Sequence, residues 1–351
     1  MKIKFASKFW KNKKVFVTGH TGFKGTWLCI FLNLLGAKIY GYSLKPEKIS
    51  LFNQSKCLKI LKSNYFGDIG DIKKLQKQLL KTKPDIIFHL AAQPLVSESY
   101  KQPLKTFQTN IMGTLNLIQA SKNVKSCKSI VIVTTDKVYK IKSNNRPYDE
   151  KDELGGEDPY SASKACTEIV TSSLAKLNDN NNISTARSGN VLGGGDYSKN
   201  RILPDIISAI NKNKILKIRN PNSIRPWQHV VEPIWGYMVL AKKQYQNKLH
   251  VENKAWNFGP NNKNFVKVNK IVKIIAKISK LKGIKIIKNT IKETKVLKLN
   301  STKSKKFLKW KPVWSLEKTL IMVLNWNQSY KTTKNARKIC ENQISEYLKM
   351  I

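Results

Sequence analysis

The sequence predicts an α/β fold, a doubly wound parallel (Rossmann) sheet with a smaller C-terminal substrate-binding lobe. In the first half of the 351 residues, short apolar runs alternate with amphipathic segments, which is typical of a parallel sheet covered by helices. A glycine-rich turn follows the first apolar run, where such sheets bind nucleotides. We expect the nucleotide-binding domain at 1–188, with a return segment at 228–260, and the substrate lobe at 189–227 and 261–351.

The predicted strands are short apolar runs, and the predicted helices have apolar residues three and four apart. The strands are Lys14 to Thr18, Ala37 to Tyr42, Ile86 to Leu90, Ser129 to Val133 and Ile183 to Arg187, with a further short strand before Asp68. The helices are Thr26 to Leu35, Ile72 to Leu80, Pro103 to Ala120 and Tyr160 to Leu177.

After Ser188 the segments become shorter and more mixed, and Gly193-Gly194-Gly195 marks a loop. Val268 to Ile278 and Leu316 to Trp326 have helical spacing. The last twenty or so residues either form a lysine-rich amphipathic helix or are irregular, and the sequence leaves both open.

The net charge of +43 suggests a nucleic-acid-binding protein, but the kind of basic residue argues against it. Only six of the 65 basic residues are arginine, the side chain that most often reads base edges. Lysine, isoleucine and asparagine are abundant and share A/T-rich codons, so we attribute the charge to genomic base composition. We expect no specific nucleic-acid partner, only non-specific attraction to polyanions.

Membrane, secreted and zinc-binding proteins are disfavoured as well. The most apolar stretch, Thr26 to Tyr42, is interrupted by Asn33, Gly36 and Lys38, so we expect no membrane span. The N-terminus shows no secretory signal. The five cysteines have no metal-ligand spacing, which predicts a cytoplasmic protein without a structural metal.

The turn at Gly19, Gly22 and Gly25 has the spacing G-x-x-G-x-x-G between the first strand and the first helix. Glycines permit a tight turn and a close approach of the backbone to a pyrophosphate, which the helix N-terminus then stabilises. The residues expected to contact a dinucleotide here are Gly19, Thr21, Gly22, Phe23 and Gly25.

Further cofactor contacts are expected after the third and fourth strands. Asp68 and Ile69 should lie near the adenine, and Leu90, Ala91 and Ala92 should pass beneath the cofactor. The second strand ends Tyr42-Ser43-Leu44-Lys45, without the carboxylate that usually holds the adenosine ribose. The residues alone therefore leave NAD and NADP open.

Tyr160 and Lys164 are one helical turn apart and face the same way. A phenol with its usual pKa of roughly 10 is a poor base at neutral pH. A neighbouring ammonium and the positive ring of an oxidised nicotinamide would lower that pKa. Tyr160 could then remove a hydroxyl proton while hydride leaves the same carbon.

Thr135, Asp136 and Lys137 follow a predicted strand, at the sheet edge where such folds place their chemistry. Thr135 could bind the reacting hydroxyl, Asp136 could protonate a leaving hydroxyl, and a neutral Lys137 could remove a carbon-bound proton. The alternative is a turn residue followed by a solvated lysine.

These motifs together resemble the extended short-chain dehydrogenase/reductase family over nearly the whole chain. The Asp136-Lys137 pair is similar to the branch of sugar-nucleotide 4,6-dehydratases that acts on CDP-glucose, since most others carry Asp-Glu there. Other matching runs are Ala91 to Val96, Arg187 to Asp196, Ile218 to Pro221, Arg225 to Val230, Trp256 to Pro260 and Leu308 to Trp314.

The resemblance implies a redox dehydration within deoxysugar biosynthesis, with bound NAD+ and a homodimer. Tyr160 with Lys164 would deprotonate the 4-hydroxyl, Lys137 would remove the C5 proton and Asp136 would protonate the leaving 6-hydroxyl. The substrate CDP-glucose would be held by Asn190, Arg201, Arg219 and Arg225, because bidentate arginine suits a diphosphate.

Other functions remain open from the sequence. A sugar-nucleotide 4-epimerase of the same fold would need Tyr160 and Lys164 but no Asp136-Lys137 pair. A 4,6-dehydratase could also act on another nucleotide sugar.

Overall fold

A seven-stranded parallel sheet forms the centre of the part of the chain that the structure describes. The structure is a computed structural model of the chain and describes residues 7–142, 146–177, 182–198, 200–249, 254–287 and 294–351. The strand order is β11-β6-β5-β4-β1-β2-β3, and neighbouring strands are parallel. The strands are β1 (Lys14–Thr18), β2 (Lys38–Ser43), β3 (Ser63–Phe66), β4 (Ile86–His89), β5 (Ser129–Val133), β6 (Asn182–Ser188) and β11 (Ala255–Phe258). The predicted α/β class is confirmed.

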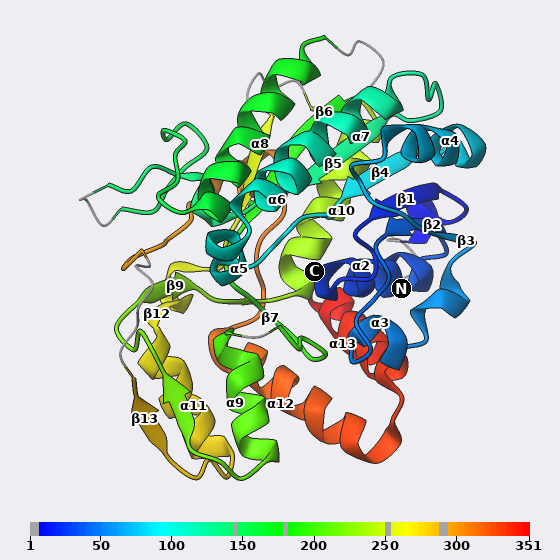
Figure 1. The fold of residues 1–351 in the computed structure, drawn as a ribbon. Helices are drawn as coiled ribbons and strands as arrows, with labels where there is room; N and C mark the ends of the chain where they lie inside the picture. The colour runs from blue at the N-terminus through cyan, green and yellow to red at the C-terminus, as the bar shows by residue number, and fades with distance from the viewer. Residues whose placement is uncertain (1–6, 143–145, 178–181, 199, 250–253, 288–293) are drawn as a thin grey trace.

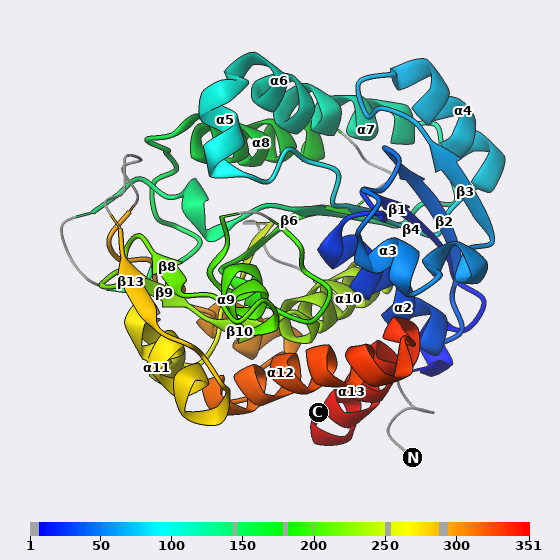
Figure 2. The same cartoon turned by 60° about the horizontal axis from the view of Figure 1, so that its bottom comes forward.

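Helices cover both faces of this sheet (Figures 1 and 2). One face carries α4 (Ile72–Thr82), α5 (Val96–Lys101), α6 (Pro103–Phe107), α7 (Gly113–Ser121) and α8 (Pro159–Ala175). The predicted helix from Pro103 to Ala120 is broken into α6 and α7 by a wider π-helical stretch, Gln108–Met112. The other face carries α2 (Phe23–Leu34), α10 (Val231–Tyr245) and α13 (Ala336–Met350), and α3 (Leu51–Gln54) lies beside α2.

The C-terminal segment, left open by the sequence, is the helix α13. It packs against α2, and Ile344 and Tyr347 join Trp27 and Phe31 of α2 in one fully buried core cluster. Complete burial of a side chain such as Phe31 or Ile344 contributes about 1.5–3 kcal/mol to stability. The chain end therefore stabilises the helix that follows the glycine turn.

The second lobe is built from short elements after β6. Its helices are α9 (Ile202–Asn211), α11 (Val268–Ile278) and α12 (Leu316–Thr333), of which α11 has the predicted bounds and α12 is longer than predicted. Its strands pair as β7 (Val191–Leu192) with β10 (Gln228–His229), β8 (Leu216–Ile218) with β13 (Ile284–Ile286), and β9 (Ile224–Pro226) with β12 (Phe265–Lys267). The exact domain boundaries stay a prediction.

Among the helices of the described ranges, none combines the length and apolar character needed to cross a membrane. That part of the chain also contains no group of three or more metal-ligating side chains.

Candidate active site

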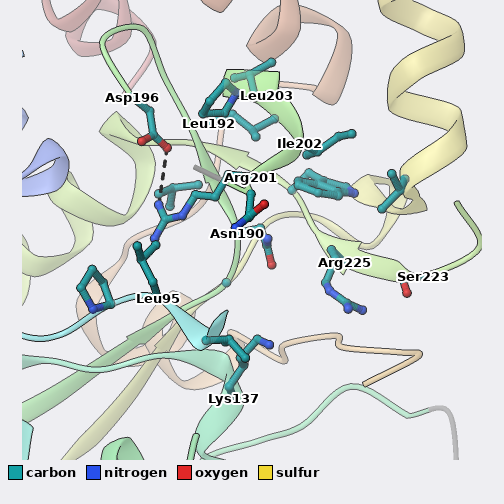
Figure 3. Close-up of a pocket in the computed structure, with 18 of the residues that line it drawn as sticks. Leu95, Lys137, Asn190, Leu192, Asp196, Arg201, Ile202, Leu203, Ser223 and Arg225 are labelled. Atoms are coloured by element: carbon teal, nitrogen blue, oxygen red, sulfur yellow. Dashed lines mark hydrogen bonds and ion pairs between the residues drawn. The ribbon is translucent and has the colours of Figure 1, made fainter. Parts of the chain in front are cut away.

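A cavity of about 260 Å³ lies where β5 and β6 end and the second lobe begins. It is lined from both parts of the fold, and Figure 3 shows side chains from each facing one another across it. The predicted site residues that line it are Thr135, Asp136, Lys137, Tyr160, Asn190, Arg201, Arg219 and Arg225. Lys164 lies behind this wall.

The turn after β5 brings Asp136 and Lys137 into the cavity. Thr135 caps a 3-10 turn, Asp136–Val138: its Oγ1 accepts from the Lys137 N–H at 3.4 Å and donates to Asp136 Oδ1 at 3.1 Å. Asp136 is only 3% exposed, and its Oδ2 has no hydrogen-bond partner among the described residues. Burial raises the pKa of Asp136, although Lys137 and Arg225 oppose the shift. A carboxyl group biased toward its protonated form suits a proton donor.

Tyr160 and Lys164 lie in the first two turns of α8. Asp158 caps the helix by accepting from the Ser161 N–H at 2.9 Å. The Lys164 Nζ donates to the carbonyl oxygen of Val133 at 3.1 Å, and burial lowers the pKa of Lys164 to about 8.

Contrary to the expectation from the sequence, the groups of the protein alone do not lower the pKa of Tyr160. Burial raises the pKa of Tyr160 to about 12, against the opposing effects of a Thr135 hydrogen bond and the Arg201 charge. The reason is that desolvation outweighs the neighbouring cations. A further positive charge at the site is needed before Tyr160 can act as a base near neutral pH.

Arginines of the second lobe give the cavity its positive side. Arg225 on β9 is 4% exposed, and its Nη1 donates to the carbonyl oxygen of Ile224 at 2.9 Å. Arg201 pairs with Asp196 at 3.4 Å (Figure 3), and Arg219 donates to Asn200 Oδ1 at 3.0 Å. Guanidinium groups held by such contacts are suited to a diphosphate.

The glycine turn fits the pyrophosphate of a dinucleotide. A Cβ at Gly19, whose φ is +71°, would lie 2.5 Å from the Ala91 nitrogen, and one at Gly25 would lie 2.2 Å from the Gly19 oxygen. Backbone therefore packs so closely here that only glycine fits. Gly22 precedes the first turn of α2 and offers no capping side chain, so the helix N-terminus can serve an anion instead.

The other predicted cofactor residues lie at the same sheet edge. Thr21 contacts Ser43 at the end of β2, with 2.8 Å between their hydroxyl oxygens. Asp68 follows β3 and its Oδ1 accepts from the Gly70 N–H at 2.7 Å, while Ile69 is buried against Gly113. Leu90, Ala91 and Ala92 follow β4, and the Ala91 N–H donates to Thr18 Oγ1 at 3.3 Å. Their roles toward a cofactor stay predictions.

Replacing Gly19 by alanine should disrupt this turn. The new Cβ would collide with the Leu90–Ala91 backbone and hold a side chain at positive φ, which costs about 1–3 kcal/mol. We expect lower stability in urea and loss of NAD+ binding by calorimetry. The matched control is Gly283→Ala, whose Cβ would have its nearest neighbour at 3.9 Å. Unchanged NAD+ affinity in Gly19→Ala would show that the turn is not the dinucleotide site.

Lys24 also lines the cavity but was not predicted as a site residue. Its Nζ donates to Ser188 Oγ at 3.0 Å. Because the chain is rich in lysine, only the position of Lys24 within the glycine turn could have indicated a role in the site.

Three kinds of comparison relate this fold and site to known proteins. Residues 16–323 match the family model described as GDP-mannose 4,6 dehydratase. The chain is 38% identical to CDP-glucose 4,6-dehydratase of Salmonella typhimurium, over 97% of each chain. It is 28% identical to UDP-glucose 4-epimerase of Mycoplasma pneumoniae, over 88% of this chain and 95% of the relative.

Solved structures share the fold at lower identity. The epimerase Mth375 of Methanothermobacter thermautotrophicus superposes with a TM-score of 0.81 and 21% identity, covering 95% of this chain and 97% of the other. dTDP-glucose 4,6-dehydratase of Bacillus anthracis, in complex with NAD, gives a TM-score of 0.76 and 22% identity, covering 93% and 99%.

Proposed function

The chain belongs to the GDP-mannose 4,6-dehydratase family, within the extended short-chain dehydrogenases/reductases, and from this premise we propose that it converts CDP-glucose to CDP-4-keto-6-deoxyglucose and water. The choice of CDP-glucose is supported by the 38% identical relative named for that reaction. Such a product belongs to deoxysugar biosynthesis. We place this reaction in the cytoplasm, in keeping with five cysteines that form no disulfide bond.

NAD is the cofactor of this family. The residues that would hold it are the glycine turn, Asp68 with Ile69, and the Leu90 to Ala92 segment. A bound NAD+ would supply the acceptor for the hydride at C4 and the donor of hydride at C6, and its positive ring would add the charge that Tyr160 lacks in the protein alone.

The protein's own groups move the protons. Thr135 orients the 4-hydroxyl, and Tyr160 takes its proton as the C4 hydride leaves, with Lys164 behind it. The 4-keto group acidifies the C5 proton, which Lys137 removes. Asp136 gives its proton to the 6-hydroxyl, which leaves as water. Lys137 returns a proton to C5, and with the hydride that the cofactor would supply at C6 the product is complete.

The observation that carries the proposal is the Asp136-Lys137 pair in the same cavity wall as Tyr160. A 4-epimerase needs only the removal and return of hydride at C4. An acid acting on the 6-hydroxyl and a base acting at C5 would therefore have no role in that reaction. The raised pKa of Asp136 fits a group that begins the elimination protonated.

The nucleotide would lie along the second-lobe side of the cavity. Arg201, Arg219 and Arg225, with Asn190 beside them, supply donors for a diphosphate. Because Arg225 is also close enough to oppose the pKa rise of Asp136, we assign it to the phosphate nearest the sugar.

Turnover of a panel of nucleotide sugars tests the substrate. The purified protein with NAD+ would be incubated with CDP-glucose, dTDP-glucose, UDP-glucose and GDP-mannose, and products followed by NMR. We expect the highest kcat/KM with CDP-glucose. A higher value with another nucleotide sugar would keep the reaction and overturn the base specificity, and conversion of CDP-glucose to CDP-galactose would make the protein an epimerase.

We also propose a homodimer formed through the outer surface of α6 and α8. Leu104 on α6 is 70% exposed and Ile169 on α8 is 57% exposed. Met112, which ends the π-helical stretch between α6 and α7, is 48% exposed. Helices α6 and α8 pack side by side (Figure 1). Exposed apolar side chains on neighbouring helices are typical of a protein–protein interface.

A charge in this surface should dissociate the dimer. Leu104→Glu combined with Ile169→Glu places carboxylates where two copies would meet, and we expect the monomer mass in sedimentation analysis at concentrations where the wild type is dimeric. The control Leu44→Glu changes a residue that is 58% exposed and directly follows β2, next to the edge strand β3. A double variant that remains dimeric would place the interface elsewhere.

A further inference from the structure

Lys24 belongs to the glycine turn in sequence but to the catalytic cavity in space. It is the second residue of α2, and its side chain reaches across to the end of β6. There its Nζ donates to Ser188 Oγ at 3.0 Å, and the Tyr237 hydroxyl donates to the same oxygen at 2.7 Å. The amine thus joins the cofactor turn to the strand that borders the reacting groups.

Lys24 and Asp136 line the same cavity. Gly189, next to the Ser188 that holds the amine, packs so close to Asp136 that a Cβ on it would lie 3.0 Å from Asp136 Oδ2. This carboxyl oxygen has no hydrogen-bond partner among the described residues. The Lys24 amine is therefore held one residue along the chain from the backbone that covers the partnerless oxygen of the proposed acid.

The groups around Lys24 are of both signs. Those that influence it are Asp136 at the end of β5, Lys164 on α8, and Asp196 and Arg201 in the loop before α9, with Tyr160 and Tyr237 close to the same groups. Burial, with the Arg201 and Lys164 charges, lowers the pKa of Lys24 to about 7, and Asp136 and Asp196 oppose this shift. The charge at this point consequently changes within the working pH range of an enzyme.

Packing alone does not account for an amine at this position. Desolvating an ammonium group costs free energy, and a hydrocarbon side chain would fill the same space without that cost. The contact with Ser188 offsets only part of it, because a neutral hydroxyl is a weaker partner than a carboxylate.

We propose that Lys24 is a positioning residue of the dehydration: its amine biases the protonation of Asp136 across the cavity, while its contact with Ser188 holds the glycine turn to the end of β6. This inference rests on the proposed function, since it assigns Lys24 to the acid named there.

Two substitutions of Lys24 should move the pH profile of kcat in opposite directions. Lys24→Met removes the charge, which raises the pKa of Asp136. The alkaline limb, which reports the loss of the Asp136 proton, then shifts to higher pH by roughly half to one unit. Lys24→Arg fixes the charge at every pH and shifts the profile to lower pH. Lys24→Gln serves as a second neutral variant if the larger guanidinium is not accommodated, and should behave as Lys24→Met.

Ser188→Ala separates the charge from the hydrogen bond. The substitution removes the hydrogen-bond partner of the Lys24 amine but keeps the amine and its charge. We therefore expect the same pH profile of kcat as in the wild type, even if the value of kcat changes. If Ser188→Ala shifts the profile as Lys24→Met does, or if all Lys24 variants lose rate without opposite shifts, Lys24 is only a structural contact and the inference is overturned.

Competitive labelling of Lys24 with acetic anhydride, read by mass spectrometry from pH 5 to 11, gives an answer independent of turnover. A reactivity midpoint close to neutral pH supports the inference, and a midpoint at the usual lysine value of about 10.4 contradicts it. A near-neutral midpoint in a protein that does not dehydrate CDP-glucose would refute the proposed function and leave the electrostatics of Lys24 standing.

Discussion

Replacing Lys137 by methionine should lower kcat on CDP-glucose by roughly 10²–10⁴-fold, the usual contribution of a general base. Methionine keeps much of the side-chain length but cannot take the C5 proton. Because Thr135, Tyr160 and Lys164 remain, hydride should still leave C4. In single-turnover mixing with excess enzyme we therefore expect reduced cofactor to accumulate, seen by its near-ultraviolet absorbance, as elimination stalls.

The control for Lys137→Met lies three residues further on. Lys140 pairs with Glu153 at 3.1 Å, and both side chains are about two-thirds exposed, 67% and 66%. Lys140→Met removes the same amine from the surface and should leave kcat unchanged. Equal kcat in Lys137→Met and the wild type would contradict the role of Lys137 and favour a reaction confined to C4.

Replacing Arg187 by methionine should destabilise the protein by about 3–5 kcal/mol, the cost of leaving one partner of a buried ion pair uncompensated. Arg187 donates to Glu168 at 2.8 Å and to the Tyr139 hydroxyl at 2.9 Å, and both members of the pair are almost fully buried. Glu168 also accepts from the hydroxyl groups of Thr134 and Thr185. The network thus joins β5, β6 and α8 directly behind the cavity.

Urea denaturation followed by circular dichroism measures the loss of stability. Lys140→Met again serves as control, since an exposed pair contributes at most about 1 kcal/mol. The double variant Arg187→Met, Glu168→Leu should recover much of the loss, because no charge is then left buried. A loss below about 1 kcal/mol in Arg187→Met would contradict this account.

The ion pair between Arg187 and Glu168 also makes the stability of the protein depend on pH, in a direction that can be predicted. Burial alone would raise the pKa of Glu168, but Arg187 and the hydroxyl donors lower it overall. A carboxyl group with a depressed pKa in the folded state stabilises the protein above the unfolded pKa of about 4.3. That stability should be lost as the pH falls through the lower folded pKa, and Arg187→Met should reduce the loss.

Particular residues show how far the sequence could predict the site. Thr135, Asp136 and Lys137 could be placed because β5 is a fully buried apolar run, and the carboxyl ends of parallel strands share one edge. The glycine turn could be recognised from spacing alone. Both predictions depend on local patterns, which a sequence displays directly.

Features that depend on long-range packing could not be predicted. Lys24 reaches Ser188 over 164 positions of chain, so its presence in the cavity follows from the fold and not from neighbouring residues. The burial that raises the Tyr160 pKa comes from several segments at once. Helix α13 packs on α2 because its apolar stripe fits there, which its own composition did not decide.

Incubation of the protein with CDP-glucose and NAD+ in D2O, with the product observed by NMR, tests the redox elimination directly. We expect a 4-keto-6-deoxy sugar that carries solvent deuterium at C5, because Lys137 exchanges the proton it removes, and unlabelled hydride from C4 at C6. A product changed only in configuration at C4, with no deuterium at C5, would contradict it.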